Sequence, residues 1–183
     1  MISVSKKVYG TGQVIEYHDN GKLKFEGEYL NGKRNGKGKE YQNAELMFEG
    51  EYLNGERNGK GKEYCDYGAL RFEGEYLNGK RNGKGKVYDD EGKLKFEGEY
   101  LNGERNGKGK EYNNNGELIF DGEYLNGKRN GNGKEYYTGG ELKFDGEFKN
   151  DKKWNGKGYD NKNNIIYELK KMEKEKNMII MVN

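Results

Sequence analysis

The sequence predicts an all-β protein: an elongated, single-layer antiparallel β-meander of tandem hairpin repeats, completed by a short C-terminal helix or cap. One phrase recurs around Phe25, Phe48, Phe72, Phe96, Phe120 and Phe144, at intervals of 23, 24, 24, 24 and 24 residues. Inside the phrase, apolar and charged residues alternate with the period of a β-strand. The chain is only 31% hydrophobic, too little for a thick two-layer core, but its 16 Tyr and 7 Phe argue against disorder.

Each repeat reads as two strands joined by a turn. In the first clear copy, the alternating run 23–29 forms a strand with one apolar face, and Asn31-Gly32 begins a turn because this dipeptide readily adopts positive φ. A second strand follows over 36–41, and a polar turn, in most copies with a Gly, leads to the next copy. We therefore divide the chain into a leader or cap (1–11), an array of about six units of 23–24 residues (12–159) and a capping tail (160–183).

Two registers are compatible with the charges of one hairpin. A four-residue loop pairs Glu26 with Lys39, Gly27 with Gly38, Glu28 with Lys37 and Tyr29 with Gly36. A two-residue loop instead pairs Glu26 with Lys37 and Phe25 with Gly38. Both avoid opposing like charges.

Glycines recur inside the predicted strands, where they normally destabilise. We interpret them as places where Tyr and Phe rings lie flat on bare backbone, so that three aromatic residues per unit supply most of the burial. Close approach of a ligand to the backbone is the functional alternative.

The repeated phrase resembles the MORN repeat, and most closely its bacterial-type variant. The matching residues are Asn20 to Tyr29 followed by Asn31 to Gly38, and the pattern returns at 92–109 and 116–133. The resemblance covers about residues 12–159. It implies a twisted meander of stacked hairpins that acts as an interaction or scaffold module, in some cases an antitoxin or immunity protein with a toxin as its partner.

No catalytic or cofactor chemistry is expected. His18 is the single histidine and falls in a turn, Cys65 is the single cysteine and lies in a variable linker, and Ser occurs only at positions 3 and 5. The His and Cys ligands of a zinc site are therefore missing. With one cysteine and no apolar leader, a cytoplasmic location is the expectation.

We predict partner binding along one rim and the Tyr-rich face, because Arg and Tyr dominate interface hot spots. The predicted partner-binding residues are Arg34, Arg57, Arg81, Arg105, Arg129, Tyr29, Tyr52, Tyr76, Tyr100 and Tyr124. The opposite rim carries acidic residues: Asp19, Asp66, Asp89, Asp90 and Glu117. Plain solvation of these turns is the simpler reading. A peripheral phospholipid-binding module is the alternative function, but one repeat has no excess basic charge.

A protein partner is expected, with a homodimer through the array ends as a further prediction. The net charge of +2 offers nothing for nucleic acid. In the tail, Ile165, Leu169, Met172 and Lys176 follow helical spacing, so we predict a short helix there. It would fold over the last hairpin and cover its raw edge; an anchor for a membrane or partner is the alternative.

Overall fold

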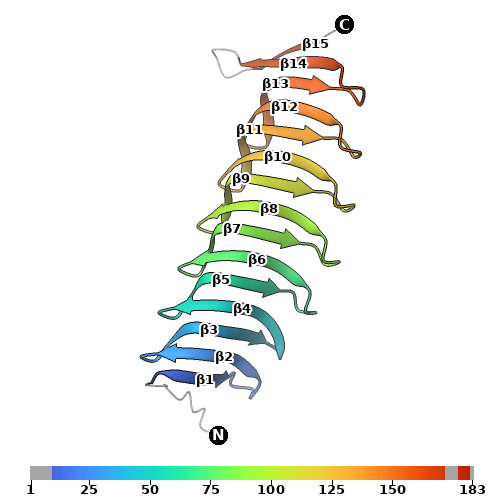
Figure 1. The fold of residues 1–183 in the computed structure, drawn as a ribbon. Helices are drawn as coiled ribbons and strands as arrows, with labels where there is room; N and C mark the ends of the chain where they lie inside the picture. Colours follow the sequence, from blue (N-terminus) through green and yellow to red (C-terminus); the bar gives the residue numbers. More distant parts are fainter. Residues whose placement is uncertain (1–9, 172–176, 182–183) are drawn as a thin grey trace. The chain divides into compact units, whose positions relative to one another are not determined.

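The computed structural model describes residues 10–171 and 177–181, and these form fifteen antiparallel strands in a single open sheet. The strands are ordered β1 to β15 along both the chain and the sheet, so each pairs with its sequence neighbours (Figure 1). The described residues contain no helix. Two compact units divide the chain, residues 1–92 with β1–β7 and residues 93–183 with β8–β15.

The strands of the first unit are β1 (Gly12–Tyr17), β2 (Leu23–Leu30), β3 (Lys33–Gln42), β4 (Glu45–Leu53), β5 (Glu56–Tyr64), β6 (Leu70–Leu77) and β7 (Lys80–Tyr88). Those of the second unit are β8 (Leu94–Leu101), β9 (Glu104–Tyr112), β10 (Leu118–Leu125), β11 (Lys128–Tyr136), β12 (Leu142–Lys149), β13 (Lys152–Tyr159), β14 (Ile165–Lys171) and β15 (Asn177–Met181).

The register within a hairpin combines features of both predicted registers. Between β2 and β3, Glu26 pairs with Lys39 and Gly27 with Gly38, as the four-residue loop requires. Beyond that point the strands reset, and Leu30 pairs with Lys33 across a two-residue Asn-Gly turn. The predicted pairs of Glu28 with Lys37 and of Tyr29 with Gly36 are therefore wrong, as are the alternative pairs of Glu26 with Lys37 and Phe25 with Gly38.

A bulge on β3 causes this reset. Between Gly38 and Arg34, β3 carries two more residues than β2 does between Gly27 and Tyr29. Gly36 lies in the bulge at φ 97°, a conformation that favours glycine. The Glu28 carboxylate accepts a hydrogen bond from the Lys37 backbone N–H at 3.3 Å, so this glutamate serves the bulge rather than a salt-bridge ladder.

A second irregularity lies at the linker end of each hairpin in the first unit. Glu40 pairs with Phe48 but Tyr41 pairs with Leu46, which leaves Met47 as an extra residue on β4. Lys24 on β2 and Arg71 on β6 occupy the same position in their strands. We call these three residues the linker-end bulge positions.

Hydrogen bonds also join the Asn-Gly turns of successive hairpins. The Gly55 N–H donates to the Arg34 carbonyl at 2.8 Å, and Gly79 donates to Arg57 at 2.9 Å. In the second unit Gly127 donates to Arg105 at 2.9 Å. Because these bonds satisfy backbone groups outside the strand ladder, they fix each turn on the one before it.

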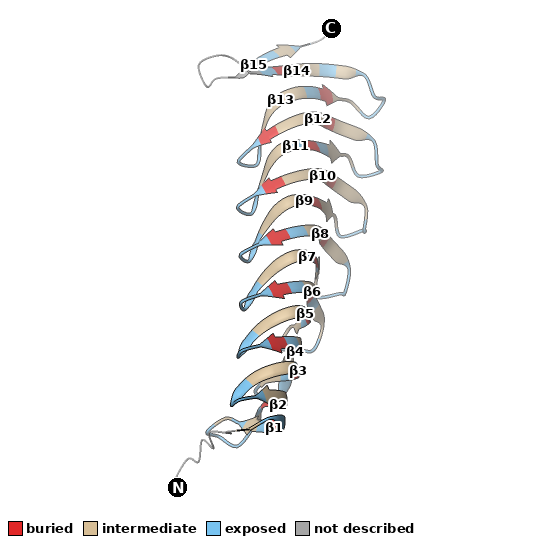
Figure 2. Ribbon diagram, turned by 60° about the vertical axis from the view of Figure 1, so that its left-hand side comes forward, coloured by how far each residue is buried: buried red, intermediate tan, exposed pale blue. Residues whose placement is uncertain are grey.

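The core is a single line of phenylalanines on one face of the sheet, which we call the Phe face. The six repeat phenylalanines are fully buried (0% exposed), and the buried patches recur at the same place on successive hairpins (Figure 2). The prediction that rings lie on glycine backbone is confirmed. A Cβ placed on Gly38 would lie 2.4 Å from Cζ of Phe25, so a side chain there has no room.

The predicted C-terminal helix is wrong. Residues 165–171 form β14 and residues 177–181 form β15, and both extend the meander. The apolar residues Ile165 and Leu169 also fit a strand period of two, with Tyr167 between them, and Tyr167 pairs with Gly158 of the preceding strand. Met172 and Lys176 of the predicted helix lie outside the described residues.

Candidate interaction surfaces

An arginine lies over each phenylalanine of the line up to Phe120. The guanidinium carbon of Arg57 is 4.0 Å from the centroid of the Phe48 ring, and Arg34 lies at the same distance over Phe25. The others repeat this geometry: Arg81 over Phe72, Arg105 over Phe96 and Arg129 over Phe120, at 4.0, 4.0 and 4.2 Å. These cation–π contacts cover the rings from the solvent side.

Glutamates of the Phe face link the arginines of successive hairpins in the first unit. Arg57 contacts Glu40 at 2.5 Å and Glu63 at 3.8 Å, while Arg34 contacts Glu40 at 3.0 Å. Glu63 in turn contacts Arg81. Each carboxylate thus lies between two guanidinium groups, which makes a continuous network rather than isolated pairs.

Tyrosine hydroxyls complete the network. Tyr52 donates to Glu40 at 2.8 Å and Tyr76 donates to Glu63 at 2.7 Å. Burial opposes ionisation of Glu63, but the hydrogen bond and charge of Arg81 and the Tyr76 hydroxyl hold the pKa of Glu63 below its usual value. Burial and the bonded Glu63 raise the pKa of Tyr76. The carboxylate therefore stays ionised and the phenol neutral near pH 7.

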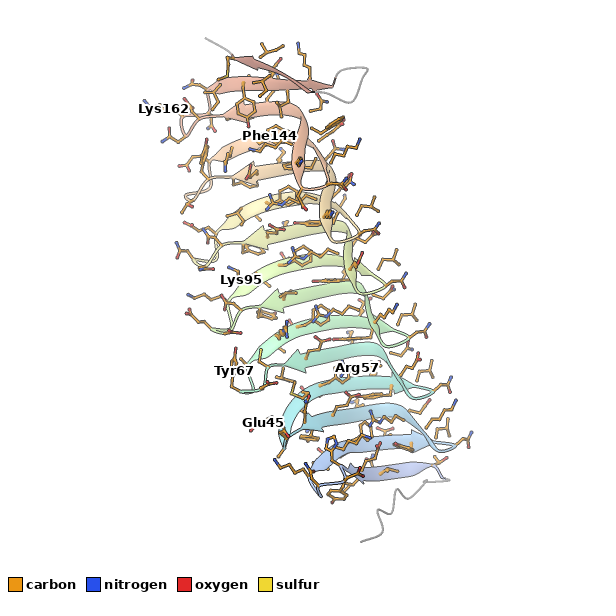
Figure 3. All side chains as sticks on the ribbon, turned by 180° about the vertical axis from the view of Figure 1, so that it is seen from behind. Glu45, Arg57, Tyr67, Lys95, Phe144 and Lys162 are labelled. Carbon is orange, nitrogen blue, oxygen red and sulfur yellow. The ribbon has the colours of Figure 1, made fainter. Side chains whose placement is uncertain are left out.

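The structure therefore places the predicted partner-binding residues inside this network. Tyr52, Tyr76, Tyr100 and Tyr124 are only 4–6% exposed, whereas Tyr29 at the first hairpin is half-buried. The arginine side chains keep 18–32% exposure where ion pairs record it. Figure 3 shows Arg57 over the strands, while Glu45 and Tyr67 lie at the linker edge of the same unit. Contact of these residues with a partner stays a prediction.

A row of half-exposed leucines lies beside the Asn-Gly turns, and the sequence analysis did not single it out. Leu30, Leu53 and Leu77 of the first unit are 44, 49 and 50% exposed. Leu101 and Leu125 of the second unit are 50 and 49% exposed. We call these five residues the leucine row. Their repetition was visible in the sequence, but a strand pattern does not show which apolar residues remain uncovered.

Charged residues lie directly across the turn from each leucine. Leu30 pairs with Lys33, Leu53 with Glu56 and Leu77 with Lys80, so the sign alternates along the row. In the second unit Leu101 pairs with Glu104 and Leu125 with Lys128. A partner that lies along this edge therefore meets apolar groups at a regular spacing, beside charges of alternating sign.

The other face of the sheet carries a second set of tyrosines. Tyr41 donates to Glu26 at 2.7 Å, Tyr64 to Glu49 at 2.7 Å and Tyr112 to Glu97 at 2.7 Å. Burial, with the hydrogen bond and charge of Glu49, raises the pKa of Tyr64 to about 12. These hydroxyls are occupied by their neighbours, which makes this face another bonded surface.

A cavity of about 500 Å³ opens in the first unit. Its lining residues are His18, Lys24, Arg34, Glu40, Tyr41, Gln42, Met47, Arg57, Glu63, Tyr64 and Arg71. It therefore includes all three linker-end bulge positions. Four cationic side chains face two carboxylates, so the lining carries an excess of positive charge.

The chemistry available to these surfaces is that of charge and apolar contact. Among residues 10–171 and 177–181, no three His, Cys, Asp or Glu side chains are grouped so that they could hold a metal ion. No helix within these described ranges is long and apolar enough to cross a membrane.

Comparison with known families matches most of the array. Residues 25–43, 48–68, 96–117, 120–141 and 144–158 match the MORN repeat, and residues 11–31 and 81–102 match the MORN repeat variant. These segments together span more than half of the chain.

No curated protein matches the sequence. Among solved structures, the chain is similar to one described as the crystal structure of the GtfA/B complex bound to UDP and GlcNAc. The TM-score is 0.29 at 14% sequence identity, over 68% of this chain and 22% of that chain. A likeness at this level carries no functional argument.

Proposed function

Because this chain belongs to the MORN-repeat family, we propose that it is a non-catalytic interaction module that binds a partner protein along its leucine row. The observation that carries the proposal is the half-exposure of one leucine at the same place in each of five successive hairpins. Folding alone does not require five uncovered leucines in register. Regular exposed apolar groups on a repeat array are typical of a binding surface.

The spacing and charge of the row favour an amphipathic helix as the bound element. Successive leucines are two strands apart, or roughly 10 Å. Seven residues of an α-helix advance about the same distance. Such a helix would place one apolar residue per two turns against Leu30, Leu53 and Leu77. It would carry flanking charges of acidic, basic and acidic sign opposite Lys33, Glu56 and Lys80.

A toxin neutralised by this chain is one partner that fits the proposal, and a structural protein held by a scaffold is another. Both would use the same surface. A membrane is a different class of partner, and the alternating signs of Lys33, Glu56 and Lys80 do not supply the cluster of basic residues that anionic lipid requires.

The test compares three forms of the intact chain as bait in affinity capture from native cells. The wild type is set beside the double variant Leu53→Ser/Leu77→Ser. The control is Tyr67→Ser, which removes a side chain that is 63% exposed but outside the row. We expect one protein to be captured by the wild type and by the control, and lost by the double variant.

Circular dichroism of the double variant checks that its fold is retained. Capture that is equal for all three baits would contradict the proposal. Flotation of the wild type with anionic vesicles, when no protein is captured, would replace a protein partner with a lipid one.

A further inference from the structure

The cavity of the first unit coincides with the one irregular interval of the repeat. The linker 42–45 is one residue shorter than its equivalents, which is why Phe48 follows Phe25 by 23 residues instead of 24. Asn43 and Ala44 close this short turn at φ 53° and 77°. Gln42 and Met47, on either side of the turn, both line the cavity. A local departure from an otherwise uniform pattern thus lies at a hollow in the surface.

The charges of the lining divide into a satisfied set and an unsatisfied one. Arg34 and Arg57 both contact Glu40, and Arg57 also contacts Glu63. The remaining cations come from the linker-end bulges. Lys24 reaches Glu16 only at 3.9 Å, and no hydrogen bond or ion pair joins Arg71 to another residue in the described part of the chain.

These two cations lie on either side of an apolar side chain. Lys24, Met47 and Arg71 occupy the same bulge position on β2, β4 and β6, so the two cations are four strands apart in the sheet. Their backbones are therefore roughly 19 Å apart. Both side chains line the one cavity, so their charged ends are closer, roughly half that distance. Met47 lies between them with Tyr41 and Tyr64 nearby in the lining.

We propose that this cavity binds an elongated organic dianion, a small molecule with an acidic group at each end of an apolar chain. One acidic group would pair with Arg71 and the other with Lys24. The apolar chain would lie against Met47, whose flexible thioether adapts to irregular contacts. This proposal is independent of the leucine row and of any partner protein.

The probe is sebacate, a straight-chain dicarboxylate, measured by isothermal titration calorimetry with the full chain. Two further ligands separate the parts of the proposal. Decanoate has a similar chain but one carboxylate, and glutarate has two carboxylates on a chain too short to reach both cations. We expect sebacate to bind about tenfold or more tightly than either, and its binding to weaken as salt is added.

The key variant is Arg71→Gln, and its matched control is Lys95→Gln. Lys95 stands at the corresponding position of β8 in the second unit and does not line the cavity. We expect Arg71→Gln to weaken sebacate binding about tenfold and Lys95→Gln to leave it unchanged. Lys24→Gln provides an independent variant should Arg71→Gln fail to fold.

Three results would overturn the proposal. They are no binding of sebacate by the wild type, equal affinity for decanoate, and equal losses in Arg71→Gln and Lys95→Gln.

Discussion

The ring of Phe48 lies against the bare backbone of Gly61 on the neighbouring strand. A Cβ built on Gly61 would be 2.5 Å from Cζ of Phe48 and 3.1 Å from Cε2 of Tyr76. The same ring is covered from above by Arg57. The glycine therefore sets the depth at which the phenylalanine is buried, and this relation explains how a sheet with 31% hydrophobic residues has a fully buried core.

Replacement of Gly61 by alanine should destabilise the first unit strongly. The added methyl group would push Phe48 away from β5 and loosen its contacts with Tyr76, which lies edge-on at 5.2 Å between ring centroids. We expect a loss of about 2–3 kcal/mol in the free energy of unfolding, measured by denaturant titration. Gly10→Ala is the matched control, because nothing lies within 4 Å of its Cβ position. Equal stability of both variants would contradict this account of the glycines.

The glutamates of the Phe face should make the protein sensitive to acid. Burial disfavours the charged form of Glu63, but Arg81 and Tyr76 outweigh it and lower the pKa of the carboxyl. A lowered pKa in the folded state means that ionised Glu63 stabilises the fold above the pKa of a free carboxyl, which is about 4.5. This stabilisation is lost as the pH falls through the lower, folded value. Melting temperature measured from pH 7 to pH 3 should therefore drop steeply below about pH 4.5.

Glu63→Gln should remove part of this acid sensitivity and destabilise the protein at pH 7. The variant leaves Arg57 and Arg81, both largely buried, without one of their carboxylates. We expect a loss of about 2–3 kcal/mol at pH 7, less than for a fully buried pair because these side chains are 22–27% exposed. Glu56→Gln in an exposed turn is the control. A pH profile of Glu63→Gln that parallels the wild type would count against the network.

The tyrosines on the other face should resist ionisation. Burial and the bonded Glu49 raise the pKa of Tyr64 to about 12, and Tyr112 with Glu97 reaches about 12 as well. A raised pKa of a neutral phenol stabilises the fold below pH 10 and is lost as the pH rises through 12. Absorbance of tyrosinate against pH should therefore show a late-titrating group of tyrosines that merges with alkaline unfolding.

Asp121→Glu should add Tyr136 to that late-titrating group. The other repeats place a glutamate where the chain has Asp121, which is one methylene shorter and pairs with Lys110 at 3.8 Å. The longer carboxylate would reach the Tyr136 hydroxyl as Glu97 reaches Tyr112. One more tyrosine should then titrate near pH 12 in the same absorbance measurement. Unchanged titration curves in this variant would contradict the role given to the glutamates.

Ala44→Gly should stabilise the protein. Ala44 has φ 77° in the two-residue turn between β3 and β4, a conformation that a Cβ disfavours. We expect a gain of about 1 kcal/mol, reduced by the greater freedom of glycine in the unfolded chain. Thermal melting measures it, with Ala69→Gly as a control, because Ala69 is absent from the positive-φ residues. A lower melting temperature for Ala44→Gly than for the control would contradict strain at this turn.

The hairpins, their order and the burial of rings on glycine could be predicted because each follows from a local repeat. The register near the turn could not, since the reset depends on a bulge at Gly36 that is stabilised by a side chain from the other strand, Glu28. The tail was wrong because Ile165 and Leu169 fit a helical and a strand period equally well, and pairing with β13 decides between them. The leucine row and the cavity depend on exposure, which no periodicity reports.

The closure of each phenylalanine by two hairpins bears on how such an array can change in length. The ring of Phe25 contacts Tyr29 from its own hairpin and Tyr52 from the following one, at 5.9 and 5.4 Å between centroids. A duplicated or deleted block that keeps whole repeats would restore both partners at every junction. A cut inside a repeat would strand a ring with one partner, so gene-level growth of the array should proceed in complete 24-residue steps, the interval between Phe48 and Phe72.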